Sequence, residues 1–158
     1  MTREDYMRQA LALAREAAEA GEVPVGCVIA DEDGQIIGRG RNRREEDKDP
    51  LAHAELIAIA DACRRFGDWR LKKASLYVTL EPCPMCAGGI ISARIPNLYY
   101  GAKDAGFGAC GSVLNLFEEN FRHHPRIIGH ILEEECGEVL REFFAQVRGK
   151  SFENLKIL

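Results

Sequence analysis

Two short motifs constrain this sequence most, because together they contain the side chains of a metal site. They are Leu-Ala-His-Ala-Glu at residues 51–55 and Glu-Pro-Cys-Pro-Met-Cys at residues 81–86. Cys83 and Cys86 are three positions apart, which places both thiolates on one face of a helix's first turn, within reach of one ion. His53 is the expected third ligand. A structural zinc normally has four protein ligands, whereas a catalytic zinc has three and keeps a position for water, so the motifs predict an open zinc site.

Glu55 is the candidate general acid/base of this site. A zinc-bound water needs a nearby carboxylate that takes up its proton and passes it on. Residues i and i+2 of a regular helix point about 200° apart, so His53 and Glu55 cannot share a helical face. They can converge only where a helix begins. We therefore expect residues 52–55 to form the entry turn of a helix.

Each motif alone has simpler explanations. A Cys-x-x-Cys pair also occurs in redox sites and zinc ribbons. A structural zinc site would need a fourth ligand from a second histidine or another cysteine and would leave Glu55 without a role; the other cysteines are Cys27, Cys63, Cys110 and Cys136. The combination of H-x-E with P-C-x-x-C, however, is the signature of zinc-dependent nucleobase deaminases, in which the glutamate is the acid/base and not a ligand.

The chain resembles the bacterial tRNA-specific adenosine deaminases, the TadA family, over nearly its whole length. Beyond the two motifs, the resemblance rests on residues 22–26 (EVPVG), 41–43 (RNR), 79–83 (TLEPC), 85–88 (MCAG), 108–112 (GACGS), 133–136 (EEEC) and 143–144 (FF). It implies zinc-dependent hydrolysis of the wobble adenosine in a tRNA anticodon to inosine. It also implies a homodimer whose active sites draw on both chains.

The resemblance implies a set of substrate-binding residues as well. Asn42 matches the family's base-binding asparagine, although asparagine is also a common turn residue. Either Phe143 or Phe144 would grip the anticodon loop, since two adjacent residues of a helix cannot face the same way. The expected apolar wall consists of Val23, Pro24 and Val25, and the candidate phosphate contacts are Lys103, Arg148 and Lys150.

Two segments depart from the family pattern. Many members have a lysine in the loop that here reads Asp-Ala-Gly-Phe-Gly at residues 104–108, and a Phe-Asn-His where this chain has Phe-Arg-His-His at 121–124. Both segments approach RNA in that family. Lys103 and Arg122 are the candidates to replace the lost groups. We expect the remaining histidines to be ordinary surface or core residues and not ligands; they are His123, His124 and His130.

Composition is consistent with one globular domain, 1–158, with a substantial core, since 46% of the 158 residues are hydrophobic. No apolar run of membrane-spanning length and no signal-peptide pattern is visible, so we expect a cytoplasmic protein with no membrane partner. The six cysteines are then expected as reduced thiols, two of them metal ligands and the others small apolar fillers.

Net charge gives no general support for an RNA partner, because the chain has a net charge of −4 and a pI of about 5.6. Two local basic runs could form a patch or an ordinary solvated surface; they are Arg39, Arg41, Arg43, Arg44 and Lys48, and Arg70, Lys72 and Lys73.

The order of elements predicts an α/β fold. Periodicity and turn signals indicate helices at 3–20, 52–66, 84–94 and 133–148, and strands at 25–30, 36–40, 75–80, 98–101 and 127–131. Residues 104–111 read as an irregular loop, and Trp69 and Leu71 as packing residues of a connection. The pattern alone supports an α/β sandwich. The family resemblance specifies a three-layer α/β/α sandwich of the cytidine deaminase-like type, with a central five-stranded mixed sheet and both metal helices on one side.

Three functions of different classes remain open from the sequence. They are deamination of the wobble adenosine of tRNA, deamination of a free nucleobase such as guanine, and a zinc-stabilised partner subunit without activity. Glu55 argues against the third, since a structural site needs no acid/base. Residues 23–26 and the helix with Phe143 and Phe144 favour the first.

Overall fold

A computed structural model describes residues 1–149 of the protein. Five strands form one sheet in the order β2-β1-β3-β4-β5. β1 pairs antiparallel with β2 and β3, while β3–β4 and β4–β5 are parallel, so the sheet is mixed as predicted. The strands are β1 (Gly26–Ala30), β2 (Ile36–Arg41), β3 (Ser75–Leu80), β4 (Asn97–Ala102) and β5 (Arg126–Ile128).

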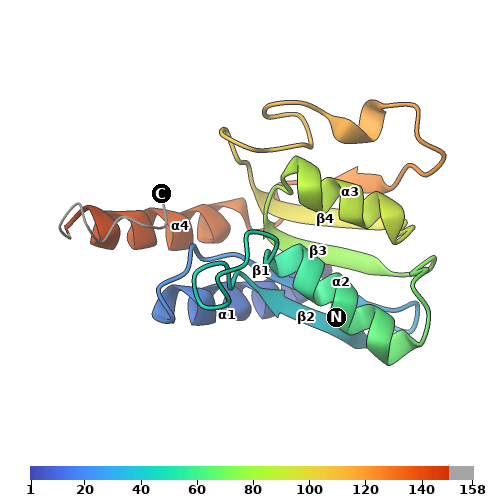
Figure 1. Cartoon of the computed structure of the whole chain (residues 1–158), viewed down its shortest axis with the longest axis horizontal. Helices are drawn as coiled ribbons and strands as arrows, with labels where there is room; N and C mark the ends of the chain where they lie inside the picture. The colour runs from blue at the N-terminus through green and yellow to red at the C-terminus, as the bar shows by residue number, and fades with distance from the viewer. Residues whose placement is uncertain (150–158) are drawn as a thin grey trace.

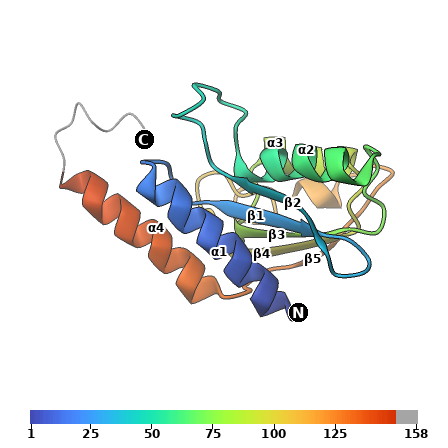
Figure 2. The same ribbon diagram turned by 90° about the horizontal axis from the view of Figure 1, so that it is seen from below.

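Helices cover both faces of the sheet. α1 (Arg3–Glu19) and α4 (Glu133–Arg148) lie side by side on one face, and α2 (Ala54–Phe66) and α3 (Pro84–Ser92) lie on the other (Figures 1 and 2). The predicted three-layer sandwich is therefore confirmed, as is the expectation that both metal helices share a side.

β1 shows how the sequence builds the two cores. All five residues of this strand are buried, because helices cover both of its faces. Cys27 and Ile29 belong to the core beneath α2 and α3, whereas Val28 and Ala30 belong to the core beneath α1 and α4. This follows from the period of two of a strand. Cys27 in one core and Cys136 in the other occupy the apolar positions that the sequence predicted.

α2 lies unusually close to β2 because two strand positions carry no side chain. A Cβ atom added to Gly38 would lie 2.4 Å from the carbonyl oxygen of Ala58, and one added to Gly40 would lie 2.3 Å from that of Ala54. Any larger residue would push the helix away from the sheet. The two glycines of β2 thus determine how close α2 lies to the sheet. The metal motif lies at the start of this helix.

Some element boundaries differ from the sequence prediction. α3 ends at Ser92 and not at residue 94, because Arg94 has a φ of +62° and its guanidinium donates hydrogen bonds to the carbonyl oxygens of Ile91 and Ser92. β5 covers only Arg126–Ile128, because His130 takes a φ of +68° and leaves the strand conformation. A short 3₁₀ helix at Leu116–Glu118 was not predicted.

The prediction for the connection after α2 was half wrong. Leu71 is buried, as expected, but Trp69 is 55% exposed. Its ring lies 5.0 Å from the guanidinium carbon of Arg70 and 5.7 Å from that of Arg94. The indole of Trp69 is therefore not buried in a core but makes two cation–π contacts at the surface.

Within residues 1–149, no helix combines the length and the apolar character that a membrane span requires.

Candidate metal centre and active site

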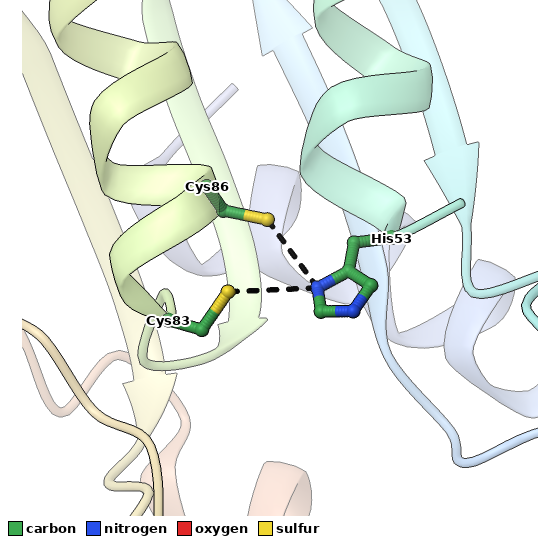
Figure 3. Close-up of side chains that lie close together, drawn as sticks. All are labelled: His53, Cys83 and Cys86. Carbon is green, nitrogen blue, oxygen red and sulfur yellow. Dashed lines mark hydrogen bonds between the residues drawn. The ribbon is translucent and has the colours of Figure 1, made fainter. Parts of the chain in front are cut away.

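The two motifs meet where α2 and α3 begin. His53 is the N-cap of α2, and Cys83 is the N-cap of α3, followed by Pro84 at the first helical position and Cys86 in the first turn. Nδ1 of His53 lies 3.6 Å from Sγ of Cys83 and 3.4 Å from Sγ of Cys86 (Figure 3). All three candidate ligand atoms lie within 4.8 Å of one another. Three side chains from two segments thus converge on one point.

This geometry fits a tetrahedral zinc ion. With Zn–S of about 2.3 Å and Zn–N of about 2.0–2.1 Å, tetrahedral angles place a ligand nitrogen about 3.6 Å from a ligand sulfur. The N–S distances at the site agree with this value. Among residues 1–149, the candidate metal group contains His53, Cys83 and Cys86 and no fourth member, so the structural-zinc alternative lacks its fourth ligand.

The two thiols differ in their readiness to ionise. Hydrogen bonds from Cys86 and His53 lower the pKa of Cys83 to about 4, whereas the neighbouring thiolate and burial raise the pKa of Cys86. The hydrogen bond to Cys83 also raises the pKa of His53. These contacts favour the thiolate form of Cys83, which is the form that binds a metal ion.

Glu55 is the second residue of α2 and is only 3% exposed. Burial raises the pKa of Glu55 to about 7. His53 stands outside the helix with extended backbone angles, which removes the conflict between positions i and i+2 and lets both side chains line one cavity. A carboxyl group that titrates near neutral pH is suited to both taking up and donating a proton.

A cavity of about 650 Å³ opens above these residues. Its floor contains His53, Glu55 and Cys83. Its walls come from the segment entering β1, the loop after β2, residues 80–85, residues 103–107 after β4, and α4. Residues that contribute to these walls include Val23, Val25, Asn42, Arg44, Pro50, Lys103, Asp104, Ala105, Phe107, Leu140 and Phe144.

Five of the seven predicted substrate-binding residues line this cavity; they are Asn42, Val23, Val25, Lys103 and Phe144. Two do not. Pro24 is buried outside the lining, because successive residues of the segment entering β1 face opposite ways. Arg148 is exposed in the last turn of α4, also outside the lining. Lys150 lies outside the described residues.

The two phenylalanines of α4 divide as the sequence predicted. Phe143 is 6% exposed and packs in the core, whereas Phe144 is partly exposed and lines the cavity. Their rings form an edge-to-face pair with centroids 5.4 Å apart. The position of Phe144 at the cavity is thus fixed by its buried neighbour.

Asn42 is 8% exposed, and its amide is already bonded within the protein. Nδ2 donates to the carbonyl oxygen of Val23 at 3.2 Å, and Oδ1 accepts from the backbone N–H of Arg44 at 3.1 Å. A primary amide has a second N–H and a second acceptor position. Asn42 therefore acts as a loop-ordering residue that still has hydrogen-bonding capacity towards the cavity.

The first basic run is mostly paired with acids of its own loop. Arg41 contacts Glu46 at 2.8 Å, and Arg43 contacts Glu46 at 3.0 Å and Asp47 at 3.1 Å. In the second run, Arg70 pairs with Asp68. These ion pairs weaken the case for a general basic patch. Lys103, in contrast, has no ion-pair partner among residues 1–149.

The three histidines outside the motifs have other partners in the described residues and are not members of the candidate metal group. His123 Nε2 donates to the carbonyl oxygen of Ile95 at 2.7 Å, and His124 Nδ1 donates to that of Phe117 at 3.0 Å. His130 contacts the carboxylate of Glu133 at 2.9 Å. The expectation that none of them is a ligand agrees with the geometry of the described residues.

Two buried carboxylates escaped the sequence analysis. Glu22 is fully buried and accepts the backbone N–H groups of Glu45 and Glu46 at 3.0 and 2.8 Å. Glu81 is 2% exposed and accepts hydrogen bonds from Asp104, Cys110 and Ser112. Burial raises the pKa of Glu81, but these hydrogen bonds outweigh burial and hold the pKa below its usual value. Both belonged to motifs, but nothing in the pattern indicated that their partners are backbone groups of distant loops.

Comparison with known proteins agrees with this site. The family model of the MafB19-like deaminases matches residues 1–148. The chain is 45% identical to the tRNA-specific adenosine deaminase of Bacillus subtilis, covering 95% of this chain and 94% of that protein. It is 43% identical to the tRNA-specific adenosine deaminase of Haemophilus influenzae, over 92% of this chain and 84% of that protein.

Solved structures show the same fold. A tRNA:A34 deaminase superposes with a TM-score of 0.82 at 46% identity, covering 86% of this chain and 99% of that chain. The guanine deaminase of Bacillus subtilis superposes with a TM-score of 0.64 at 32% identity, covering 96% of this chain and 97% of that one. Taken with the three-ligand site and the buried Glu55, these similarities show that the chain belongs to the deaminase family that contains the tRNA-specific adenosine deaminases.

Proposed function

We propose that this protein is a zinc-dependent hydrolase that converts the wobble adenosine of a tRNA anticodon to inosine. The observation that carries the proposal is the convergence of His53, Cys83 and Cys86 beside the buried Glu55, at the floor of a cavity of about 650 Å³. This volume is in the usual range for a site that encloses a small molecule or a single base. The identity of 45–46% to tRNA-specific deaminases supports this substrate class.

The residues that would hold zinc are His53 through Nδ1 and the thiolates of Cys83 and Cys86. When bound there, zinc supplies an activated water nucleophile near neutral pH. Three protein ligands are the number typical of a catalytic zinc site, which keeps a further position for water.

Glu55 has the role of proton carrier. Its carboxylate takes one proton from the attacking water and passes it to ring nitrogen N1 of the adenine while the water oxygen bonds to C6. It then moves the proton of the new C6 hydroxyl to the amino group, so that the C6–N bond breaks, ammonia leaves and the C6 carbonyl of inosine forms. Burial raises the pKa of this carboxyl group to about 7, which suits a group that both takes up and donates a proton.

A flipped base would be held by the cavity walls. Val23, Val25 and Phe144 provide apolar contacts for its faces, and the remaining N–H of Asn42 can donate to an acceptor on its edge. Lys103 is the cavity residue suited to a phosphate of the anticodon loop. Arg148 would contact phosphates farther from the reacting base.

The proposal includes a cytoplasmic homodimer. Its support in the fold is a group of exposed apolar side chains after β4; they are Val113 at 55%, Leu114 at 43% and Phe121 at 45% exposure. Exposed apolar side chains of this kind are candidates for burial in a protein interface. Sedimentation equilibrium of the wild type and of Leu114→Glu would test this part independently of activity.

Deamination of free guanine is the second candidate, because a guanine deaminase of 32% identity has the same fold. One assay separates the two. The purified protein is incubated with a tRNA anticodon hairpin containing the wobble adenosine, with free guanine and with free cytosine. Inosine formed in the hairpin supports the proposal, whereas rapid conversion of guanine without inosine in any hairpin would establish the alternative.

A further inference from the structure

Glu81 occupies a position that the chemistry at the metal does not explain. It lies two residues before Cys83, yet its carboxylate points to the loop that follows β4, residues 103–115. Oε1 accepts from the backbone N–H of Asp104 at 3.1 Å and from the hydroxyl of Ser112. Oε2 accepts from the backbone N–H groups of Cys110 at 2.8 Å and Ser112 at 3.2 Å.

These four hydrogen bonds use the whole acceptor capacity of the carboxylate. An ionised carboxylate has about four lone-pair positions, two on each oxygen, and all four have a protein donor here. Glu81 therefore has no acceptor left for a substrate, although it borders the cavity. Its function must be expressed through the loop.

The loop is packed directly on this carboxylate. A Cβ atom added to Gly108 would lie within 2.3 Å of Oε2 of Glu81 and 2.6 Å of the carbonyl oxygen of Asp104. The backbone N–H of Ala109 also donates to the carbonyl oxygen of Pro82 at 2.8 Å. The loop is thus attached to the segment that leads into the metal helix α3.

Two cavity residues depend on this attachment. Lys103 directly precedes Asp104, whose N–H is bound to Glu81. The Asp104 carboxylate in turn accepts the backbone N–H of Phe107 at 3.2 Å, which fixes the turn that presents the Phe107 ring. Phe107 lines the cavity and is 69% exposed, so it lies at the cavity's open edge.

We propose that Glu81 is a positioning residue that holds Lys103 and Phe107 at the mouth of the active site, where they contact the nucleotides beside the reacting adenosine. A cation and an exposed aromatic ring are the pair of groups that bind single-stranded nucleic acid, through phosphate attraction and base stacking. This inference rests on the proposed function for its substrate. Through Glu81, the segment that carries Cys83 would also influence substrate binding by the loop after β4.

The test uses Glu81→Gln, which keeps the size of the side chain. An amide NH2 in place of Oε1 would face the N–H of Asp104, and in place of Oε2 it would face the N–H groups of Cys110 and Ser112. Either orientation leaves at least one buried backbone donor without an acceptor. We expect KM for an anticodon hairpin to rise by roughly tenfold or more, the scale of one unsatisfied buried donor, while zinc content stays that of the wild type.

Glu22→Gln is the matched control, since Glu22 is an equally buried carboxylate that binds a different loop. In Glu81→Gln, amide hydrogen exchange should accelerate over residues 103–112 and stay unchanged over residues 43–47. In Glu22→Gln, it should accelerate over residues 43–47 and stay unchanged over residues 103–112. Equal acceleration of both loops in either variant would indicate general destabilisation and overturn the inference.

A double-mutant cycle provides the decisive measurement. If Glu81 acts by presenting the ring of Phe107, the KM effect of Glu81→Gln should shrink by at least roughly threefold in a Phe107→Ala background, because contacting groups are not additive. Full additivity would overturn the inference. If Glu81→Gln does not fold, Ser112→Ala, which removes one of the four hydrogen bonds, should raise KM in the same direction, and an unchanged KM and loop exchange would be contrary evidence.

The two proposals fail separately. A wild type that forms no inosine in any hairpin overturns the proposed function, whatever the loop does. A wild type that forms inosine, with Glu81→Gln showing the same KM and the same exchange rates, overturns only the role of Glu81.

Discussion

Nδ1 of His53 lies 3.4 Å from Sγ of Cys86, although 33 positions separate the two residues in the chain. The separation is bridged because the first turns of α2 and α3 lie next to each other on one face of the sheet (Figure 3). A metal ion bound here would connect two helices as well as serve a reaction. Removal of a ligand should therefore affect both metal content and stability.

Cys86→Ala should abolish metal binding, since two remaining ligands cannot hold zinc tightly. The purified wild type should contain about one zinc per chain, as a single three-ligand site requires. Elemental analysis of both proteins measures this directly. Cys136→Ala is the control, because Cys136 is buried in the core on the other face of the sheet and should leave zinc content unchanged. Zinc retained in Cys86→Ala would contradict the ligand assignment.

Glu55→Ala should keep both zinc and fold but lose turnover by at least roughly 10²-fold, the contribution of a removed general acid/base. The measurement is single-turnover formation of inosine in an anticodon hairpin, with zinc content determined on the same sample. Glu32→Ala, at an exposed position of the β1–β2 turn, should behave as the wild type. A zinc-free Glu55→Ala protein would instead identify Glu55 as a ligand.

The stability of the metal-free protein should depend on pH through Glu55. Burial raises its folded-state pKa from 4.5 to about 7, so the folded state binds this proton more tightly than the unfolded state. The stabilisation is complete below about 4.5 and is lost as pH rises through 7. Glu55→Gln cannot ionise, so its free energy of unfolding relative to wild type should increase by on the order of 2–3 kcal/mol between pH 4 and pH 8.

Urea unfolding in the presence of a chelator measures this difference at each pH. The charge of Glu55 also raises the pKa of His53, so the difference between the two proteins includes this coupling as well as the ionisation of Glu55. A difference that stays constant from pH 4 to pH 8 would show that Glu55 ionises normally in the fold.

Phe143 and Phe144 form a natural pair for separating packing from binding. Phe143→Ala removes a core side chain and should lower the free energy of unfolding by about 3–5 kcal/mol. Phe144→Ala should change stability much less but weaken binding of the hairpin, because its ring lines the cavity. Phe143→Ala should thus have the larger effect on thermal unfolding, and Phe144→Ala the larger effect on hairpin affinity. The same order in both measurements would exclude Phe144 as a substrate contact.

The salt dependence of hairpin binding should identify phosphate contacts. Each phosphate neutralised on a single strand contributes a slope of about −0.7 in a plot of log K against log salt. Lys103→Ala and Arg148→Ala should each flatten the slope. Asn42→Ala should reduce turnover and leave the slope nearly unchanged, because in the proposed function the amide contacts a base edge and no phosphate. Titrations at several salt concentrations decide this, and an unchanged slope in Lys103→Ala would remove it from the phosphate contacts.

The metal centre could be predicted from the sequence because its information is local. Cys83, Pro84 and Cys86 indicate a helix start by themselves. Because His53 and Glu55 cannot share one face of a regular helix, the sequence also predicts that they lie where a helix begins. The roles of Glu22 and Glu81 could not be predicted in this way. Apart from the hydroxyl of Ser112, their partners are backbone N–H groups more than twenty positions away, which carry no residue-type signal.

Trp69 illustrates a second limit. A large apolar residue in a connection normally packs inside, so a packed environment was the prediction for Trp69. The exposed position arises because two arginines, one of them from the end of α3, lie near the ring. Their meeting depends on the tertiary fold and on the positive φ of Arg94, which periodicity does not reveal.

The close contact between α2 and β2 has a practical consequence for redesign. Gly38 and Gly40 determine the distance between α2 and the sheet. Even an alanine at either position should therefore shift the carboxyl group of Glu55 relative to the cysteines of α3. The cavity walls come from other segments, in the loops and α4. Libraries that seek new substrates should therefore vary wall positions such as Val23, Lys103 and Phe107 and leave the strand beneath the helix untouched.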